Sequence, residues 1–216
     1  MGVANIWKRL SSHWRAALDE AWEAYKAGSV PIGAVIVDAE GRILTRGHSR
    51  RFESTGEPGT VFGNPLAHAE LNALLALDYA KAEPRECILY TTVEPCPLCM
   101  GAAYMAGIRR ILYASHDPWA GSANMLGATP YLSMKPVKCP DPDDPELEEA
   151  MIALNVEFFC QGTMRRNDDL IDALRAISPR ATAHGQKLFA SGALREAARA
   201  GMPMEEALDL LTPAEG

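Results

Sequence analysis

Two short motifs, H-A-E at residues 68–70 and P-C-P-L-C at residues 95–99, constrain this chain more than any other feature. One imidazole and two thiolates can hold a zinc ion by three ligands, which leaves the fourth tetrahedral position open, as in catalytic rather than structural zinc sites. A carboxylate beside metal-activated water can accept its proton and pass it on. The motifs therefore predict a site with zinc ligands His68, Cys96 and Cys99, and with Glu70 as the catalytic acid–base group.

The order of the predicted elements explains how ligands so far apart can meet. Apolar runs and turn residues predict a hairpin of two strands, then a helix, a strand, a helix and a strand, over residues 30–38, 43–48, 65–77, 87–92, 95–107 and 111–114. This order is typical of a three-layer α/β domain. Right-handed crossovers would bring both helices to one face of the sheet, with their N-termini side by side and His68 facing the two cysteines.

The pairing of H-x-E with P-C-x-x-C is the signature of zinc-dependent nucleobase deaminases. The chain resembles the cytidine/deoxycytidylate deaminase superfamily, and within it the branch that holds the tRNA adenosine, guanine and cytosine deaminases. The resemblance implies a cytidine-deaminase-like fold: a mixed sheet of about five strands, the fifth near Val137, with helices on both faces. We expect a zinc-dependent deaminase domain over residues 1–160 and a helical C-terminal extension of unknown role over residues 161–216.

The resemblance also implies substrate contacts. In the family, the main-chain amide between the metal-ligand His and the Glu contacts the substrate, and Ala69 holds that position here. The branch often carries Asn at the end of its second strand, where this chain has Ser49, which offers fewer donors and acceptors. His48 either compensates for the missing amide or forms part of the pocket wall. Residues 117–122 resemble the loop that closes the pocket, so Asp117 and Trp119 are expected to touch the base.

The resemblance implies hydrolysis of an exocyclic amine on a nucleobase or nucleoside, with release of ammonia and with purines favoured. An alternative is a tRNA-specific adenosine deaminase, which converts adenosine to inosine. A further alternative is a non-catalytic zinc-binding module, which would have no need of Glu70. A structural zinc completed by a fourth thiolate also stays open, since the chain holds three more cysteines: Cys87, Cys139 and Cys160.

Composition bears on partners and location. The net charge of −7 disfavours tRNA as a partner, because nucleic-acid binding depends on basic patches. No apolar run reaches the 18 or so residues of a membrane span, so no membrane partner is expected. A C-x-x-C motif beside a His motif indicates metal binding in a reducing compartment, and we expect a cytoplasmic homodimer. Residues 164–216 are expected to be removable, leaving a zinc-loaded core.

Overall fold

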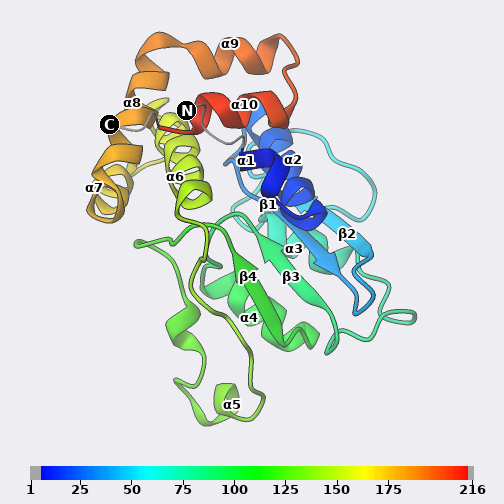
Figure 1. Ribbon diagram of the computed structural model, residues 1–216. Coiled ribbons are helices and arrows are strands. Elements are labelled where there is room, and N and C mark those ends of the chain that lie inside the picture. Colours follow the sequence, from blue (N-terminus) through cyan, green and yellow to red (C-terminus); the bar gives the residue numbers. More distant parts are fainter. Residues whose placement is uncertain (1–5, 214–216) are drawn as a thin grey trace.

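The computed structural model describes residues 6–213, so the outermost residues of both expected domains lie outside the described part of the chain. Along the chain the elements are α1 (Ile6–Arg9), α2 (Ser12–Lys26), β1 (Gly33–Val37), β2 (Ile43–His48), α3 (Ala69–Leu75), β3 (Ile88–Thr91), α4 (Pro97–Ala106), β4 (Arg110–Tyr113), a short 3-10 helix (Ala123–Met125), α5 (Pro130–Ser133), α6 (Pro145–Cys160), α7 (Asn167–Ile177), α8 (Pro179–Ser191), α9 (Ala193–Arg199) and α10 (Met204–Leu211) (Figure 1). None of the helices within residues 6–213 is long and apolar enough to cross a bilayer.

The four strands in the described part of the chain form one mixed sheet in the order β2-β1-β3-β4. Strand β1 pairs antiparallel with both β2 and β3, whereas β3 and β4 are parallel. Helix α3 connects β2 to β3, and α4 connects β3 to β4. Both connections advance in the same direction across the sheet, so right-handed crossovers bring both helices to one face. The predicted three-layer arrangement is confirmed.

Strand β1 is buried on both faces, as its continuous apolar sequence predicts. Ala34 and Ile36 share a buried cluster with residues of α3 and α4, whereas Val35 and Val37 pack with α2. Gly47 in β2 is required by the same packing. A Cβ atom there would lie 2.5 Å from the carbonyl oxygen of Ala69, so only glycine lets α3 approach this closely.

The prediction of a fifth strand near Val137 is wrong for the described part of the chain. Near Val137 a single bridge joins Lys138 to Arg110, and the pairing goes no further. Pro136 and Pro140 flank this point, and a proline has no N–H to donate to a ladder of hydrogen bonds. The sheet therefore ends at β4.

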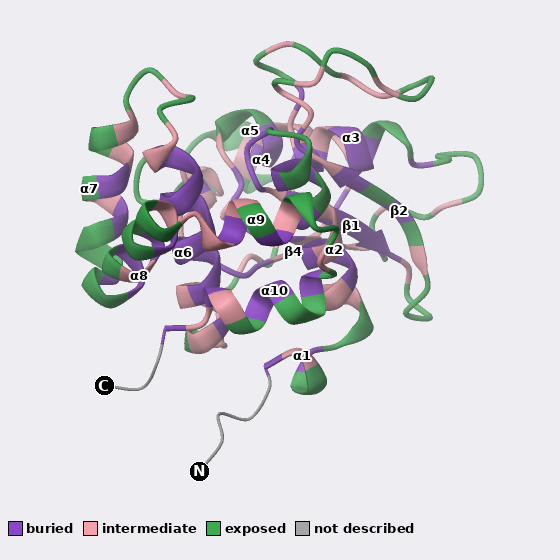
Figure 2. Cartoon of the chain, turned by 90° about the horizontal axis from the view of Figure 1, so that it is seen from above, coloured by how far each residue is buried: buried purple, intermediate pink, exposed green. Residues whose placement is uncertain are grey.

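The helices that follow residue 160 pack on α6 and α2 and share their hydrophobic core. Figure 2 shows α6 buried along most of its length, and α10 with buried residues on one side and exposed residues on the other. The shared buried cluster includes, from the C-terminal helices, Ile171, Leu174, Ala181, Leu188, Leu194, Met204, Ala207, Leu208 and Leu211. The Trp22 indole N–H also donates a 2.7 Å hydrogen bond to the carbonyl of Met202.

A polar network lies inside this packing and joins α2, α6 and α9. The Glu157 side chain is fully buried, and its carboxylate pairs with Arg195 at 2.7 Å. It also accepts hydrogen bonds from the Tyr25 hydroxyl at 2.6 Å and from the Gln161 amide at 2.8 Å. Burial, followed by the hydrogen bond to Glu157, raises the pKa of Tyr25, which therefore stays a neutral donor. Three donors thus compensate one buried carboxylate.

Candidate active site

The three predicted zinc ligands meet at the adjacent N-termini of α3 and α4. His68 is the residue before the first turn of α3, Cys96 holds the same position in α4, and Cys99 lies in the first turn of α4. The His68 Nδ1 atom lies 3.5 Å from the Cys96 Sγ atom and 3.3 Å from the Cys99 Sγ atom. Residues 28 positions apart in the sequence are therefore brought into contact by the two crossover helices.

The geometry fits zinc. Bonds of about 2.3 Å to sulfur and about 2.0 Å to nitrogen at tetrahedral angles place the two ligand atoms roughly 3.5 Å apart, close to the observed distances. Within residues 6–213, His68, Cys96 and Cys99 form the one group of three or more potential ligand side chains close enough to hold an ion. The other described cysteines, Cys87 and Cys139 among them, do not join it. The site therefore offers three ligands, as a catalytic zinc requires.

Electrostatic coupling within the group prepares it for a cation. Hydrogen bonding with Cys99 lowers the pKa of Cys96 to about 4, against the effect of burial and with a smaller contribution from His68. The same hydrogen bond, together with burial, raises the pKa of Cys99. The two thiols therefore differ in acidity, and metal binding, which requires both as thiolates, would release their protons.

Glu70 lies in the first turn of α3, beside the ligands. Its side chain is buried, and its Oε2 atom lies 3.3 Å from the Cys99 Sγ atom. Burial raises the pKa of the Glu70 carboxyl, and the positive charge of His68 opposes this shift. A carboxyl group with a raised pKa next to a metal site is suited to accept and return protons.

The ligands and Glu70 open into a cavity of about 480 Å³, within the range of small-molecule sites. Four of the residues predicted to contact substrate line this cavity: Ser49, Ala69, Asp117 and Trp119. Trp119 is about half exposed, so its ring is available at the cavity surface. The Asp117 carboxylate accepts 2.9 Å hydrogen bonds from the backbone N–H groups of Trp119 and Ala120, which fixes the turn of this loop.

The structure places His48 outside the lining of the cavity. Its Nδ1 atom lies 2.9 Å from the Glu20 carboxylate on α2, and its Nε2 atom lies 3.3 Å from Glu53. Ser49, by contrast, is buried beside the cavity, and its Oγ atom lies 3.4 Å from that of Ser29. Of the two neighbours, only Ser49 is therefore placed where a ligand could reach it.

Sequence reasoning missed Glu94, which organises the loop at residues 117–123. One carboxylate oxygen accepts from the N–H of Asp117 at 3.3 Å, and the other accepts from the N–H of Ala123 at 3.0 Å. The loop passes so close that a Cβ atom on Gly121 would clash with this carboxylate. The position of Glu94 directly before the P-C-P-L-C motif could have indicated this role, because a charged side chain beside a buried site needs hydrogen-bond partners.

The cavity has a further wall that no sequence motif indicated. Residues from the segment between α6 and α7, and from α7 itself, line it: Thr163, Met164, Arg165, Arg166 and Leu170. These side chains are more than 90 positions from His68 and belong to the predicted extension. Only the packing of α7 and α8 on α6 brings them to the site.

Comparisons with known proteins agree with this geometry. Residues 8–115 match the model of the cytidine and deoxycytidylate deaminase zinc-binding region, which is half of the chain. The chain is 38% identical over 108 residues to a tRNA(Ile)-lysidine synthase of Deinococcus radiodurans, covering 49% of this chain but 17% of that protein. It is 33% identical over 118 residues to a tRNA-specific adenosine deaminase of Bacillus subtilis, covering 53% of this chain and 66% of that protein.

Among solved structures, a guanine deaminase from Nitrosomonas europaea superposes with a TM-score of 0.51 at 22% identity, covering 68% of this chain and 84% of that one. This likeness confirms the predicted fold. The chain spans less than two thirds of the length of either protein matched by sequence. With the fold, the three zinc ligands and the family match in agreement, the chain belongs to the cytidine and deoxycytidylate deaminase family.

Proposed function

We propose that this chain is a zinc-dependent hydrolase that replaces an exocyclic amine of a nucleobase or nucleoside with a carbonyl, releasing ammonia. We favour a purine of the guanine or adenine type. The observation that carries the proposal is the placement of Glu70 beside a His–Cys–Cys group at one cavity of ligand size. A purely structural zinc site would need neither the carboxylate nor the cavity.

Each residue then has a definite task. When bound, zinc supplies a Lewis acid that makes water a stronger nucleophile at neutral pH. Glu70 would accept a proton from the attacking water and would return protons to the ring nitrogen and to the leaving amine. Because Ala69 is small, the base can approach the N-terminus of α3 closely. Trp119 offers a flat apolar ring on which a base can stack, and Ser49 offers a hydroxyl at the cavity wall.

One observation favours a second candidate, an adenosine deaminase that acts on tRNA. The cavity is lined by three arginines, Arg51, Arg165 and Arg166, which could contact phosphates. The Bacillus subtilis relative named above is a tRNA-specific adenosine deaminase. The net charge of −7 belongs to the whole chain and does not describe this local group, so it does not decide between the two substrates.

The decisive experiment measures ammonia release from a panel of adenine, guanine, cytosine, their nucleosides and unmodified tRNA, with the zinc-loaded Glu70→Gln protein as the control. We expect release from a purine base or nucleoside. Inosine formation in tRNA without release from any small compound would promote the second candidate. Release from none of them would favour a zinc-binding module without catalysis.

We also propose that the chain forms a homodimer. Several large apolar side chains on and near α4 are exposed, led by Met134 at 71% and Met105 at 67%. Exposed apolar patches of this kind are typical of protein–protein contacts. Light scattering on the purified chain should give twice the mass of one chain, and introducing Met105→Glu should shift it toward the monomer.

A further inference from the structure

The loop that follows β4 and the segment that precedes α7 meet at the edge of the cavity. The guanidinium carbon of Arg166 lies 5.0 Å from the centroid of the Trp119 ring, within the range of a cation–π contact. The Nε atom of Arg166 also pairs with the Asp169 carboxylate at 2.6 Å. The guanidinium group therefore pairs with an acid in the first turn of α7 while it covers the indole ring.

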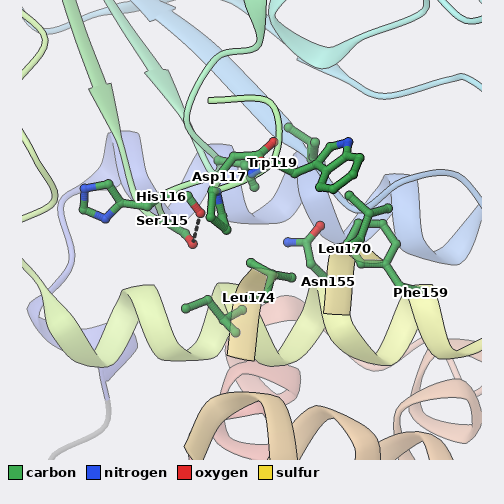
Figure 3. Close-up of a pocket in the computed structure, with 12 residues that line it drawn as sticks. Ser115, His116, Asp117, Trp119, Asn155, Phe159, Leu170 and Leu174 are labelled. Atoms are coloured by element: carbon green, nitrogen blue, oxygen red, sulfur yellow. Dashed lines mark hydrogen bonds between the residues drawn. The ribbon is translucent and has the colours of Figure 1, made fainter. Parts of the chain in front are cut away.

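Trp119 borders two cavities rather than one. Besides the cavity of about 480 Å³, a smaller cavity of about 50 Å³ lies next to it, and the two share six lining residues: Ile32, Val93, Asp117, Trp119, Phe159 and Leu170. Figure 3 shows the Trp119 ring beside Leu170 and Phe159 at the edge of the smaller cavity. The ring therefore lies at the boundary where the two cavities share their lining.

The backbone and the ring of Trp119 are fixed by different groups. Asp117 accepts from the Trp119 N–H, and Glu94 accepts from the N–H groups at both ends of the loop. These bonds fix the course of the chain but leave rotation about the side-chain bonds free. The ring is about half exposed, so packing alone holds it weakly, and the Arg166 guanidinium covers it.

We propose that Arg166 is a positioning residue that sets the orientation of the Trp119 ring and thereby the size of base that the cavity accepts. The inference rests on the proposed function, because it assigns specificity to that same site. Arg166 and Leu170 lie beyond residue 115, where the family match ends, so the specificity of the site depends on a part of the chain outside the family's zinc-binding region.

Two measurements on the full-length, zinc-loaded chain test this proposal. The chain is labelled with 5-fluorotryptophan, and the Trp119 fluorine resonance is assigned with Trp119→Phe. Arg166→Ala should shift or broaden that resonance, and Arg166→Lys should restore it in part because the cation remains. The matched control is Arg175→Ala, which removes an arginine of α7 that has a similar ion pair, with Asp172 three residues away, and no place in the cavity.

The second measurement is the affinity for adenine and for cytosine, probes of two sizes, in a Glu70→Gln background that prevents turnover. Arg166→Ala should change the ratio of the two dissociation constants by about two- to fivefold, and Arg175→Ala should leave it unchanged. An unaltered Trp119 resonance or an unaltered ratio in Arg166→Ala overturns the positioning role. The proposed function is tested separately by the ammonia-release panel: if no base or nucleoside is deaminated, the proposed function fails, and the specificity role fails with it.

Discussion

The buried carboxylate of Glu157 allows a sharp test of how the C-terminal helices stabilise the fold. Replacing Arg195 with methionine keeps most of the apolar length of the side chain but removes the cation. Glu157 would then be a fully buried carboxylate whose remaining donors within residues 6–213 are Tyr25 and Gln161. Removing one partner of a buried ion pair costs about 3–5 kcal/mol, because the other charge stays buried without compensation.

The lower end of that range applies here for two reasons. The Arg195 side chain is 30% exposed, so water already screens part of the pair, and two neutral donors still reach the carboxylate. We therefore expect Arg195→Met to lower the free energy of unfolding by about 3 kcal/mol. The double variant with Glu157→Gln should be more stable than Arg195→Met alone, because it no longer buries an uncompensated charge.

Equilibrium urea unfolding of the zinc-loaded chain, followed by tryptophan fluorescence, measures these values. Arg199→Met is the matched control, since Arg199 is an exposed arginine on the same helix, and its effect should stay within about 0.5 kcal/mol. A loss below about 0.5 kcal/mol for Arg195→Met as well would refute the reasoning. The pair of Arg195 and Glu157 would then add no stability beyond that provided by water at the same carboxylate.

Three further outcomes follow from the site and its surroundings. Cys99→Ala should lose bound zinc and lower the melting temperature, and full zinc content by elemental analysis would contradict the ligand assignment. Glu70→Gln should keep zinc and fold but lose at least about 10²–10⁴-fold in turnover, so activity within tenfold of the original would contradict its role. Burial lowers the pKa of His116, but its hydrogen bonds to Glu148 and Asp141 outweigh this effect and leave the pKa raised. His116 therefore adds stability that is complete below about pH 6.5 and is lost as the pH rises through its folded-state pKa, so the stability advantage over His116→Gln should shrink as the pH rises above about 6.5.

The zinc group and the layers of the fold could be predicted because local sequence fixes them. His68 and Cys96 each precede a helix, and right-handed crossovers place the two helix N-termini together. The sequence also allowed the prediction that the side chains of His48 and Ser49 point in opposite directions. Successive residues of a strand point to opposite faces of a sheet, so only one of them could face α3. Gly47 faces α3. The next side chain, His48, therefore points toward α2, and Ser49 points again to the side of the cavity.

The wall of the cavity could not be predicted in this way. Arg166 and Leu170 reach the site only through the packing of α7 and α8 on α6, and no local pattern records such a long-range contact. The number of strands was harder to predict. Val137 favours a strand because it is β-branched, but the prolines on both sides limit the pairing to one bridge.

The same packing argues against one expectation about the C-terminal helices. The sequence indicates that residues 164–216 can be removed, yet Gly185 on α8 lies so close to α6 that a Cβ atom there would sit 2.6 Å from the Ala153 carbonyl oxygen. Each large apolar side chain buried by these helices contributes about 1.5–3 kcal/mol, so the loss of five of them, about 7.5–15 kcal/mol, is comparable to the 5–15 kcal/mol that typically holds a domain together. The truncation would also leave the Trp22 indole without its partner at Met202. We therefore expect a chain ending at residue 163 to be insoluble or to lack a cooperative thermal transition. A soluble, zinc-loaded and cooperatively melting product would show that α6 needs no cover from α7–α10.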